Sequence, residues 1–289
     1  MSTDFTDRAT LTDWTDPTDP TGPAEPMPFR LASRQPVSLA EVLVEAPQLT
    51  RVDRKYLVDV ATAQALIDGL SPDFRVLSIE GRRSTSYLST YFDTADLASV
   101  RAHVQRRRRR WKARSRLYVE DRLCRVEVKT SDGRGVTAKI VTDADLASYG
   151  RLDEASAAFV AATLAENQMP VDVRELRPTM EIAYRRTTLA DTVNEMARVT
   201  LDWQVHSTLD GRRVWLDDDY VLVETKGGLR PGQADRLLAG LGHHPRSFSK
   251  YAAAASLIRD DLHDNDVRRL HGRQLHSAPA APVLERATA

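Results

Sequence analysis

Residues Trp111–Val119 read WKARSRLYV, and this stretch gives the strongest indication of the fold. Lys112, Arg114 and Arg116 alternate with apolar or small residues along it. A β-strand sends successive side chains to opposite faces, so the three cations would share one surface of a sheet. The sequence therefore predicts a strand with one charged face and one apolar face.

Three further stretches repeat this alternation. They are residues 124–130, with Arg125, Glu127 and Lys129; residues 198–203, with Arg198, Thr200 and Asp202; and residues 221–226, with Glu224 and Lys226. One such strand is ordinary, because an antiparallel sheet often exposes a polar face to water. Four such strands indicate that their charged side chains lie together on one surface, which could hold a polyanion.

The composition limits the possible functions. The chain has 289 residues and is 42% hydrophobic, which is enough for one large domain or two small ones. Its 41 basic and 41 acidic residues lack the basic excess that is typical of nucleic-acid binders. No helix-turn-helix, zinc-finger spacing or aromatic RNA-binding pattern occurs either. We therefore expect no nucleic-acid partner, and any basic site must be local.

The single cysteine, Cys124, cannot form an intrachain disulfide. It falls on the apolar face of its strand, where it is expected to be a small buried hydrophobic residue. No run approaches the ~18 apolar residues of a membrane span, and no basic start followed by an apolar stretch opens the chain. These features predict a soluble cytoplasmic protein without a transmembrane segment.

The chain divides into a long central domain and two tails. Thr-Asp and Asp-Pro repeats predict a disordered acidic tail at residues 1–36, and residues 263–289 are expected to be loose. The domain spans residues 37–262, with helices expected at 39–45, 59–70, 145–167, 232–241 and 251–262. Strands are expected at 51–58, 74–80, 84–92, 105–119, 123–131, 135–141, 177–189, 196–206, 212–216 and 219–226. Most connections between strands are too short for a crossover helix, which predicts an α+β fold dominated by antiparallel pairs.

Charged faces can turn inward if the strands close into a barrel, because residues of a barrel alternate between interior and exterior. The apolar exterior would then pack against the flanking helices, and the interior would become a charged lumen. Two cations ~4 Å apart repel each other by roughly 4 kcal/mol at an effective dielectric constant near 20. Such a lumen needs interleaved carboxylates or a bound anion.

Several short motifs occur in a characteristic order. They are 54–58 (RKYLV), 89–94 (STYFDT), 112–118 (KARSRLY), 126–129 (VEVK), 184–186 (YRR), 198–202 (RVTLD), 223–226 (VETK) and 249–251 (SKY). Together they resemble the VTC domain, the catalytic part of the vacuolar transporter chaperone polyphosphate polymerase. That domain belongs to the triphosphate tunnel metalloenzyme (CYTH-like) superfamily. The resemblance covers about residues 48 to 260.

The resemblance implies an antiparallel β-barrel, a triphosphate tunnel, that binds ATP, phosphate, growing polyphosphate and a divalent metal, Mn²⁺ or Mg²⁺. It implies that basic residues of the lumen grip phosphates: Lys55, Arg114, Arg116, Lys129, Arg186, Arg198, Lys226 and Lys250, of which Arg114, Arg116, Lys129 and Lys250 would bind ATP. Glu224 matches the metal-binding glutamate of the family, and Glu127 is a second candidate. Asp53 stands where the family often has Glu, and we leave it out of the site. The chain lacks the inositol-phosphate-sensing domain and membrane helices of the eukaryotic complex, so product translocation is not implied.

Three functions follow from these residues. The first is polyphosphate synthesis, in which the γ-phosphate of ATP is transferred to phosphate or to a polyphosphate end. The second is hydrolysis of triphosphates or tripolyphosphate by the same tunnel, and the third is polyphosphate binding without catalysis. Simpler structural interpretations also stand: Asp202 and Glu181 could be buried partners of arginines, and Asp93 could bond to nearby backbone at a turn.

Overall fold

The structure is a computed structural model that describes residues 27–44, 52–133, 137–193 and 197–280. Its helices are α1 (Leu39–Val44), α2 (Val60–Gly69), α3 (Ala98–Val104), α4 (Glu154–Glu166), α5 (Gln233–Gly240) and α6 (Lys250–Ile258). Its strands are β1 (Pro36–Val37), β2 (Val52–Asp59), β3 (Phe74–Leu77), β4 (Thr85–Asp93), β5 (Arg110–Tyr118), β6 (Leu123–Ser131), β7 (Thr137–Ala144), β8 (Arg177–Asp191), β9 (Arg198–Leu209), β10 (Arg212–Leu216), β11 (Tyr220–Gly227) and β12 (Leu275–Pro279).

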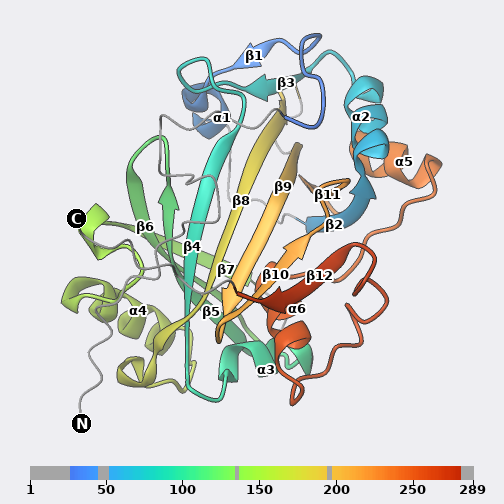
Figure 1. Cartoon of the computed structure of the whole chain (residues 1–289). Helices are drawn as coiled ribbons and strands as arrows, with labels where there is room; N and C mark the ends of the chain where they lie inside the picture. The colour runs from blue at the N-terminus through green and yellow to red at the C-terminus, as the bar shows by residue number, and fades with distance from the viewer. Residues whose placement is uncertain (1–26, 45–51, 134–136, 194–196, 281–289) are drawn as a thin grey trace, which may run out of the picture.

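One mostly antiparallel sheet carries the fold, as the alternating strands predict. Its longest path runs β7-β6-β5-β4-β8-β9 and continues through β11 to β2. Strands β10 and β12 extend the sheet from the other end of β9. The α+β fold with flanking helices is confirmed, and Figure 1 shows the long strands β8 and β9 at the centre of the molecule.

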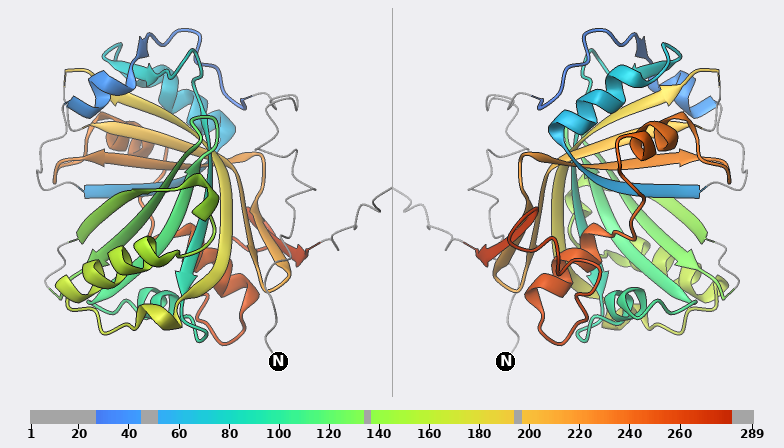
Figure 2. Two further views of the ribbon diagram at one scale, coloured as in Figure 1. Left: turned by 90° about the vertical axis from the view of Figure 1, so that its left-hand side faces the viewer. Right: turned by 90° about the vertical axis from the view of Figure 1, so that its right-hand side faces the viewer.

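A closed barrel is not confirmed. Strands β2 and β7 stand at the two ends of the path, and among the described residues no ladder of hydrogen bonds joins them. The sheet is nevertheless strongly curved (Figure 2). The ammonium of Lys129 on β6 interacts electrostatically with Asp53 and Lys55 on β2, near the other end of the path. Side chains of β6 and β2 therefore interact across the space between the two ends of the sheet.

Local sequence explains the principal turns and helix ends. Asp59 and Asp153 each accept a backbone hydrogen bond at the start of α2 and α4, from Thr62 at 2.6 Å and from Ser156 at 2.8 Å. Asp210 and Gly211 both have positive φ, 50° and 66°, which matches the two-residue hairpin turn between β9 and β10.

The outer face of the sheet is apolar and covered by helices. On one side Trp111, Val126 and Val128 pack against Val160 and Leu164 of α4. A second cluster joins β2, β9 and β11 to α2 and α5, which lie together in Figures 1 and 2. Cys124 is buried on this face, as predicted. Burial of apolar surface stabilises these contacts by ~25 cal/mol per Å², and a further core cluster joins β8, β9 and β10 to α6.

Several segments differ from the sequence expectation; the strand expected at 105–119 is β5 and begins at Arg110. The region expected to be a single helix at 145–167 begins with a 3-10 turn at Leu146–Ser148, and Gly150 at φ 82° separates it from α4. Within the expected C-terminal tail, β12 pairs with β10 along its whole length. Of the expected N-terminal tail, residues 1–26 lie outside the described residues, whereas Phe29 and Leu31 are buried beside α2. No helix among the described residues has the length and apolarity needed to cross a membrane.

Candidate functional site

The strand registers place most of the predicted charged residues on one face. Lys112, Arg114 and Arg116 are opposite Lys129, Glu127 and Arg125, and Glu224 is opposite Lys55. We call this surface the inner face, defined by Lys55, Tyr87, Tyr91, Lys112, Arg114, Arg116, Glu127, Lys129, Lys139, Tyr184, Arg186, Asp202, Glu224 and Lys226. The alternation seen in the sequence is therefore confirmed as a shared charged surface.

Glu127 is the centre of one charge cluster on the inner face. Its carboxylate accepts from Arg114 Nε at 2.8 Å and from Lys139 Nζ at 2.9 Å, and Arg116 Nη1 lies 3.8 Å away. Only 3% of Glu127 is exposed. Burial alone would raise the pKa of this carboxyl, but Arg114, Arg116 and Lys139 outweigh burial and hold the pKa well below its usual range.

Asp202 is the centre of a second cluster. Arg186 donates to it from Nε at 2.5 Å and from Nη2 at 2.8 Å, in a two-point fork, and the Lys250 ammonium binds the same carboxylate. Burial opposes the charge of Asp202, yet these two cations keep the pKa of Asp202 lowered. The interpretation of Asp202 as a buried arginine partner is thus confirmed. Glu181, by contrast, accepts from the Tyr149 hydroxyl at 3.3 Å.

Aromatic rings support the arginines between these clusters. Tyr87 and Tyr184 stack with their centroids 5.1 Å apart, and Arg116 and Arg186 both lie over these rings. Arg116 also donates to the Tyr184 hydroxyl at 2.9 Å. A guanidinium on a ring face is held flat while its other edge remains available to a phosphate. The rings therefore fix the arginines in place before any ligand arrives.

Lys112 has a different environment. Its ammonium donates to the Ser249 hydroxyl at 2.7 Å, and it forms no ion pair with any carboxylate in the described part of the chain. Burial, followed by repulsion from Lys129, Lys55, Arg114 and Arg110, lowers the pKa of Lys112 to about 7. The pKa of Lys129 is also lowered, first by burial. Lys112 thus lies among cations that have carboxylate neighbours of their own, Arg114 with Glu127 and Lys55 with Glu224, while Lys112 itself has no carboxylate partner among the described residues.

Glu224 lies at the edge of this crowded region. Lys226 Nζ is 3.4 Å and Lys55 Nζ is 3.9 Å from its carboxylate oxygens. Although burial would raise the pKa of Glu224, Lys226, Lys55 and the more distant Arg186 lower it. The carboxylate is therefore ionised throughout the physiological pH range.

Three residues need separate placement. Arg198 stands opposite Lys226 in register, and its guanidinium donates to the carbonyl of Val42 at the end of α1. Asp53, which the sequence analysis left out, is opposite Lys226 on β2 and interacts with Lys129. Asp93 accepts from the backbone of Thr94, Ser99 and Val100, in the turn-forming role expected for it. Asp93 thereby anchors the start of α3 without joining the inner face.

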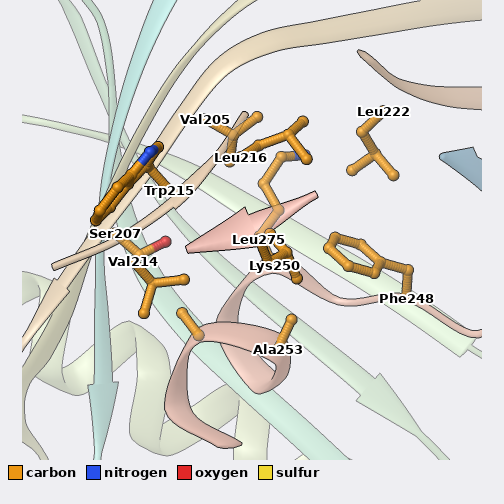
Figure 3. Close-up of a pocket in the computed structure, with 11 residues that line it drawn as sticks. Val205, Ser207, Val214, Trp215, Leu216, Leu222, Phe248, Lys250, Ala253 and Leu275 are labelled. Atoms are coloured by element: carbon orange, nitrogen blue, oxygen red, sulfur yellow. The ribbon is translucent and has the colours of Figure 1, made fainter. Parts of the chain in front are cut away.

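Lys250, the first residue of helix α6, brings its ammonium to the inner face. Its ammonium lies 4.4 Å from the centre of the Tyr184 ring. Beside the Lys250 side chain is a cavity of about 20 Å³ with mainly apolar walls, including Leu216, Leu222 and Phe248 (Figure 3). A cavity of this size admits one water molecule at most. The apolar side of Lys250 is therefore packed, and only its ammonium serves the charged surface.

A divalent metal can be tested against these donors. In the described ranges no three acidic, histidine or cysteine side chains gather as an all-protein metal cage would need. Mg²⁺ is commonly held by one or two carboxylates together with substrate phosphates, and Glu224 fits that mode. Both oxygens of Glu127 already bind cations, which suits a residue that positions Arg114.

The fold and this charged face define a class of domain in which a curved antiparallel sheet presents cations on its concave side. The VTC domain family matches residues 50–258, and the chain belongs to this family, as the motifs predict. A search of curated proteins finds no significant match.

Two solved structures are among those to which the chain is similar. One is a putative adenylate cyclase from Bacillus halodurans, 16% identical over 67% of this chain and 89% of that chain, with a TM-score of 0.38. The other is a putative adenylyl cyclase from Hippeastrum, described as having a dominant triphosphatase activity. It is 16% identical over 74% of this chain and 100% of that chain, with a TM-score of 0.45.

Sequence reasoning missed several members of the inner face. Lys112 alternates with Arg114 and was visible in the same pattern, but it was not included among the predicted site residues. Lys139 had only a weak alternating signal in its strand, and its contact with Glu127 depends on the pairing of β6 with β7. Tyr87 and Tyr184 carried no signal that separates them from ordinary packing residues.

Proposed function

We propose that this protein is an ATP-dependent polyphosphate polymerase, which transfers the γ-phosphate of ATP to phosphate or to the end of a polyphosphate chain. The observation that carries the proposal is Lys112, whose ammonium bonds to Ser249, has no carboxylate partner among the described residues and is repelled by Lys129, Lys55 and Arg114. A bound polyanion would remove this repulsion. Membership of the VTC domain family supports the same assignment. A cytoplasmic location, where ATP is available, is part of the proposal.

In this proposal the cations of the inner face bind and orient the phosphates. Arg114 and Arg116, whose guanidinium groups already bond to Glu127, Ser89 and tyrosine hydroxyls, would contribute their remaining N–H groups and their charge, and Lys55, Lys112, Lys129, Lys226 and Lys250 would act as point charges along the polyphosphate chain. An oxygen of the acceptor phosphate attacks the γ-phosphorus, the bond between the γ-phosphorus and the bridging oxygen breaks, and ADP leaves with the electron pair. The residues supply positioning and charge neutralisation, which are the main demands of phosphoryl transfer.

Glu224 is the proposed ligand of Mg²⁺ or Mn²⁺. The bound ion would neutralise charge on the transferred phosphate. Glu127 has the proposed role of holding Arg114 and Arg116 in position, because both of its oxygens face cations. Arg198 is proposed to contact the polyphosphate chain only near the end of α1, because its guanidinium also contacts the Val42 carbonyl there.

Product analysis tests the proposal. The purified protein is incubated with ATP and Mn²⁺ or Mg²⁺, and polyphosphate is resolved on a gel beside an ADP assay. We expect chains longer than the input together with ADP. ADP and free phosphate without chains would replace polymerisation with hydrolysis, and no nucleotide turnover with either metal would favour a polyphosphate-binding protein.

The metal assignment has its own test. Glu224→Gln keeps the shape of the side chain and removes its charge, so turnover should fall by ~100-fold or more, while tripolyphosphate binding stays within about threefold. Glu166→Gln, at the exposed end of α4, is the matched control and should retain full activity. Full activity of the Glu224 variant would remove Glu224 from the metal site.

A further inference from the structure

A second cavity lies next to the inner face and is used by none of the steps above. Its volume is about 270 Å³, and it is formed by α3, α6 and residues 263–267. Small-molecule sites begin at roughly 300 Å³, so the cavity has the size of a site for one compact organic group. A long polyphosphate chain would not be enclosed by it.

The cavity adjoins the crowded cations directly. Ser249 lines it, and the hydroxyl of Ser249 accepts the hydrogen bond from the Lys112 ammonium at 2.7 Å. His103 also lines it and interacts electrostatically with Lys112, Lys55 and Lys129. A group bound in this cavity would therefore be separated from Lys112, in the proposed phosphate site, by the side chain of Ser249.

The cavity walls suit a neutral, polar ligand with an aromatic part. Phe248 and His103 offer rings, and burial together with the neighbouring cations lowers the pKa of His103 to about 3, so this imidazole is neutral. Ser256 and Asn265 offer hydrogen-bonding groups that can meet the edge of a base.

The carboxylates of the cavity disfavour a phosphate within it. Asp264 and Asp266 line the walls together with one arginine, Arg106; Asp266 pairs with Arg106 at 2.9 Å, and Asp264 pairs with Arg268 outside the lining. Carboxylates repel phosphate oxygens but accept hydrogen bonds from ribose hydroxyls, as in dinucleotide-binding folds. The inner face, which carries cations, suits the negatively charged triphosphate of a nucleotide. The cavity, which carries carboxylates, suits its uncharged nucleoside.

We propose that this cavity binds the nucleoside of the donor nucleotide, with the triphosphate passing Ser249 to reach Lys112 and the inner face. The inference rests on the proposed function for the identity of the donor. It adds a nucleotide-specific site to a surface that otherwise recognises phosphate alone. Inorganic tripolyphosphate would bind the inner face without entering the cavity.

The test compares two ligands on a variant that fills the cavity. Binding of ATP and of inorganic tripolyphosphate is measured by calorimetry in one magnesium-containing buffer, for the native chain and for Ser256→Trp. We expect ATP affinity to fall by about tenfold or more, while tripolyphosphate affinity changes less than twofold. Thr208→Trp introduces the same side chain at an exposed position of β9 outside the cavity, and it should change neither affinity.

Equal losses for both ligands, or no loss for either, would overturn the inference. If Ser256→Trp does not fold, Asn265→Trp, at an exposed position on the rim, gives the same comparison. The two proposals fail in different ways. Selective loss of ATP binding without any chain synthesis keeps the nucleoside site and removes the polymerase, whereas chain synthesis with unchanged ATP affinity in the variant removes only the nucleoside site.

Discussion

Two parts of the inner face treat positive charge differently. Around Glu127 and Asp202 each carboxylate binds two or more cations, and stacked tyrosines hold the guanidinium groups in place. Around Lys112 the cations face one another, and Ser249 provides the hydrogen bond that a carboxylate would provide elsewhere. The cations of the first part are balanced by carboxylates of the protein, whereas Lys112 lacks a carboxylate partner among the described residues, and in the proposal an anionic ligand supplies that charge.

The largest effect should come from removing the charge of Glu127, the carboxylate that balances several cations of the inner face. In Glu127→Gln, Arg114, Arg116 and the half-exposed Lys139 lose their shared carboxylate, and the free energy of unfolding should fall by about 3–5 kcal/mol because the buried Arg116 and the largely buried Arg114 are left without their carboxylate. Urea unfolding measures this loss, and added tripolyphosphate should recover part of it. A change below about 1 kcal/mol would mean that Glu127 does not organise this cluster.

Removing the charge of Lys112, which has no carboxylate partner among the described residues, should affect ligand binding and not stability. Lys112→Met should weaken tripolyphosphate binding by about tenfold or more, roughly 1.4 kcal/mol, without lowering the thermal stability of the free protein. Lys139→Met is the matched control, because Glu127 already balances Lys139, and it should weaken binding less. Equal losses in the two variants would abolish the distinction between the two parts.

The pH dependence of tripolyphosphate affinity tests the same difference between Lys112 and the cations that have carboxylate partners. Since the pKa of Lys112 is lowered to about 7 in the free protein, a bound anion raises it, and binding takes up a proton above pH 7. Tripolyphosphate affinity should therefore fall as pH rises above 7, by up to about tenfold per pH unit. The native chain must be compared with Lys112→Met, which removes the contribution of the ligand's own titration. Identical pH profiles would show that Lys112 does not titrate on binding.

The smallest effect should come from the outer side of the sheet. Asp59→Ala removes the N-cap of α2 and should lower the free energy of unfolding by about 1 kcal/mol. ATP turnover per folded molecule should not change, because α2 packs on the apolar face. A loss of turnover beyond the loss of folded protein would connect this helix to the site.

Alternation along single strands was enough to predict the inner face. The cations of Trp111–Val119 and the carboxylates of the later strands share one surface because the side-chain period of a strand is fixed at two. Periodicity could not predict closure, however, because it says which face a residue occupies and not which strands pair. That no pairing joins β2 and β7 among the described residues became visible only in three dimensions.

The missed elements depend on distant contacts. The N-cap of helix α3 is Leu97, which has a left-handed backbone and no side-chain cap, and the carboxylate that meets its first N–H groups belongs to Asp93, outside the usual N-cap position, so the usual start signal is absent. Strand β12 lacks β-branched residues and gains its order by pairing with β10. The carbonyl partner of Arg198 and the cavity beside Ser249 likewise arise from segments far apart in the chain.

The most direct test of polymerisation follows the transferred phosphate itself. ATP labelled at the γ-phosphate is incubated with the protein, Mn²⁺ and an unlabelled short polyphosphate primer, and the products are separated by length. We expect the label to appear in chains longer than the primer, with ADP formed in equal amount, and Lys112→Met to slow this incorporation. Label found only in free phosphate would contradict the account, because the inner face would then deliver the phosphate to water and not to a chain end.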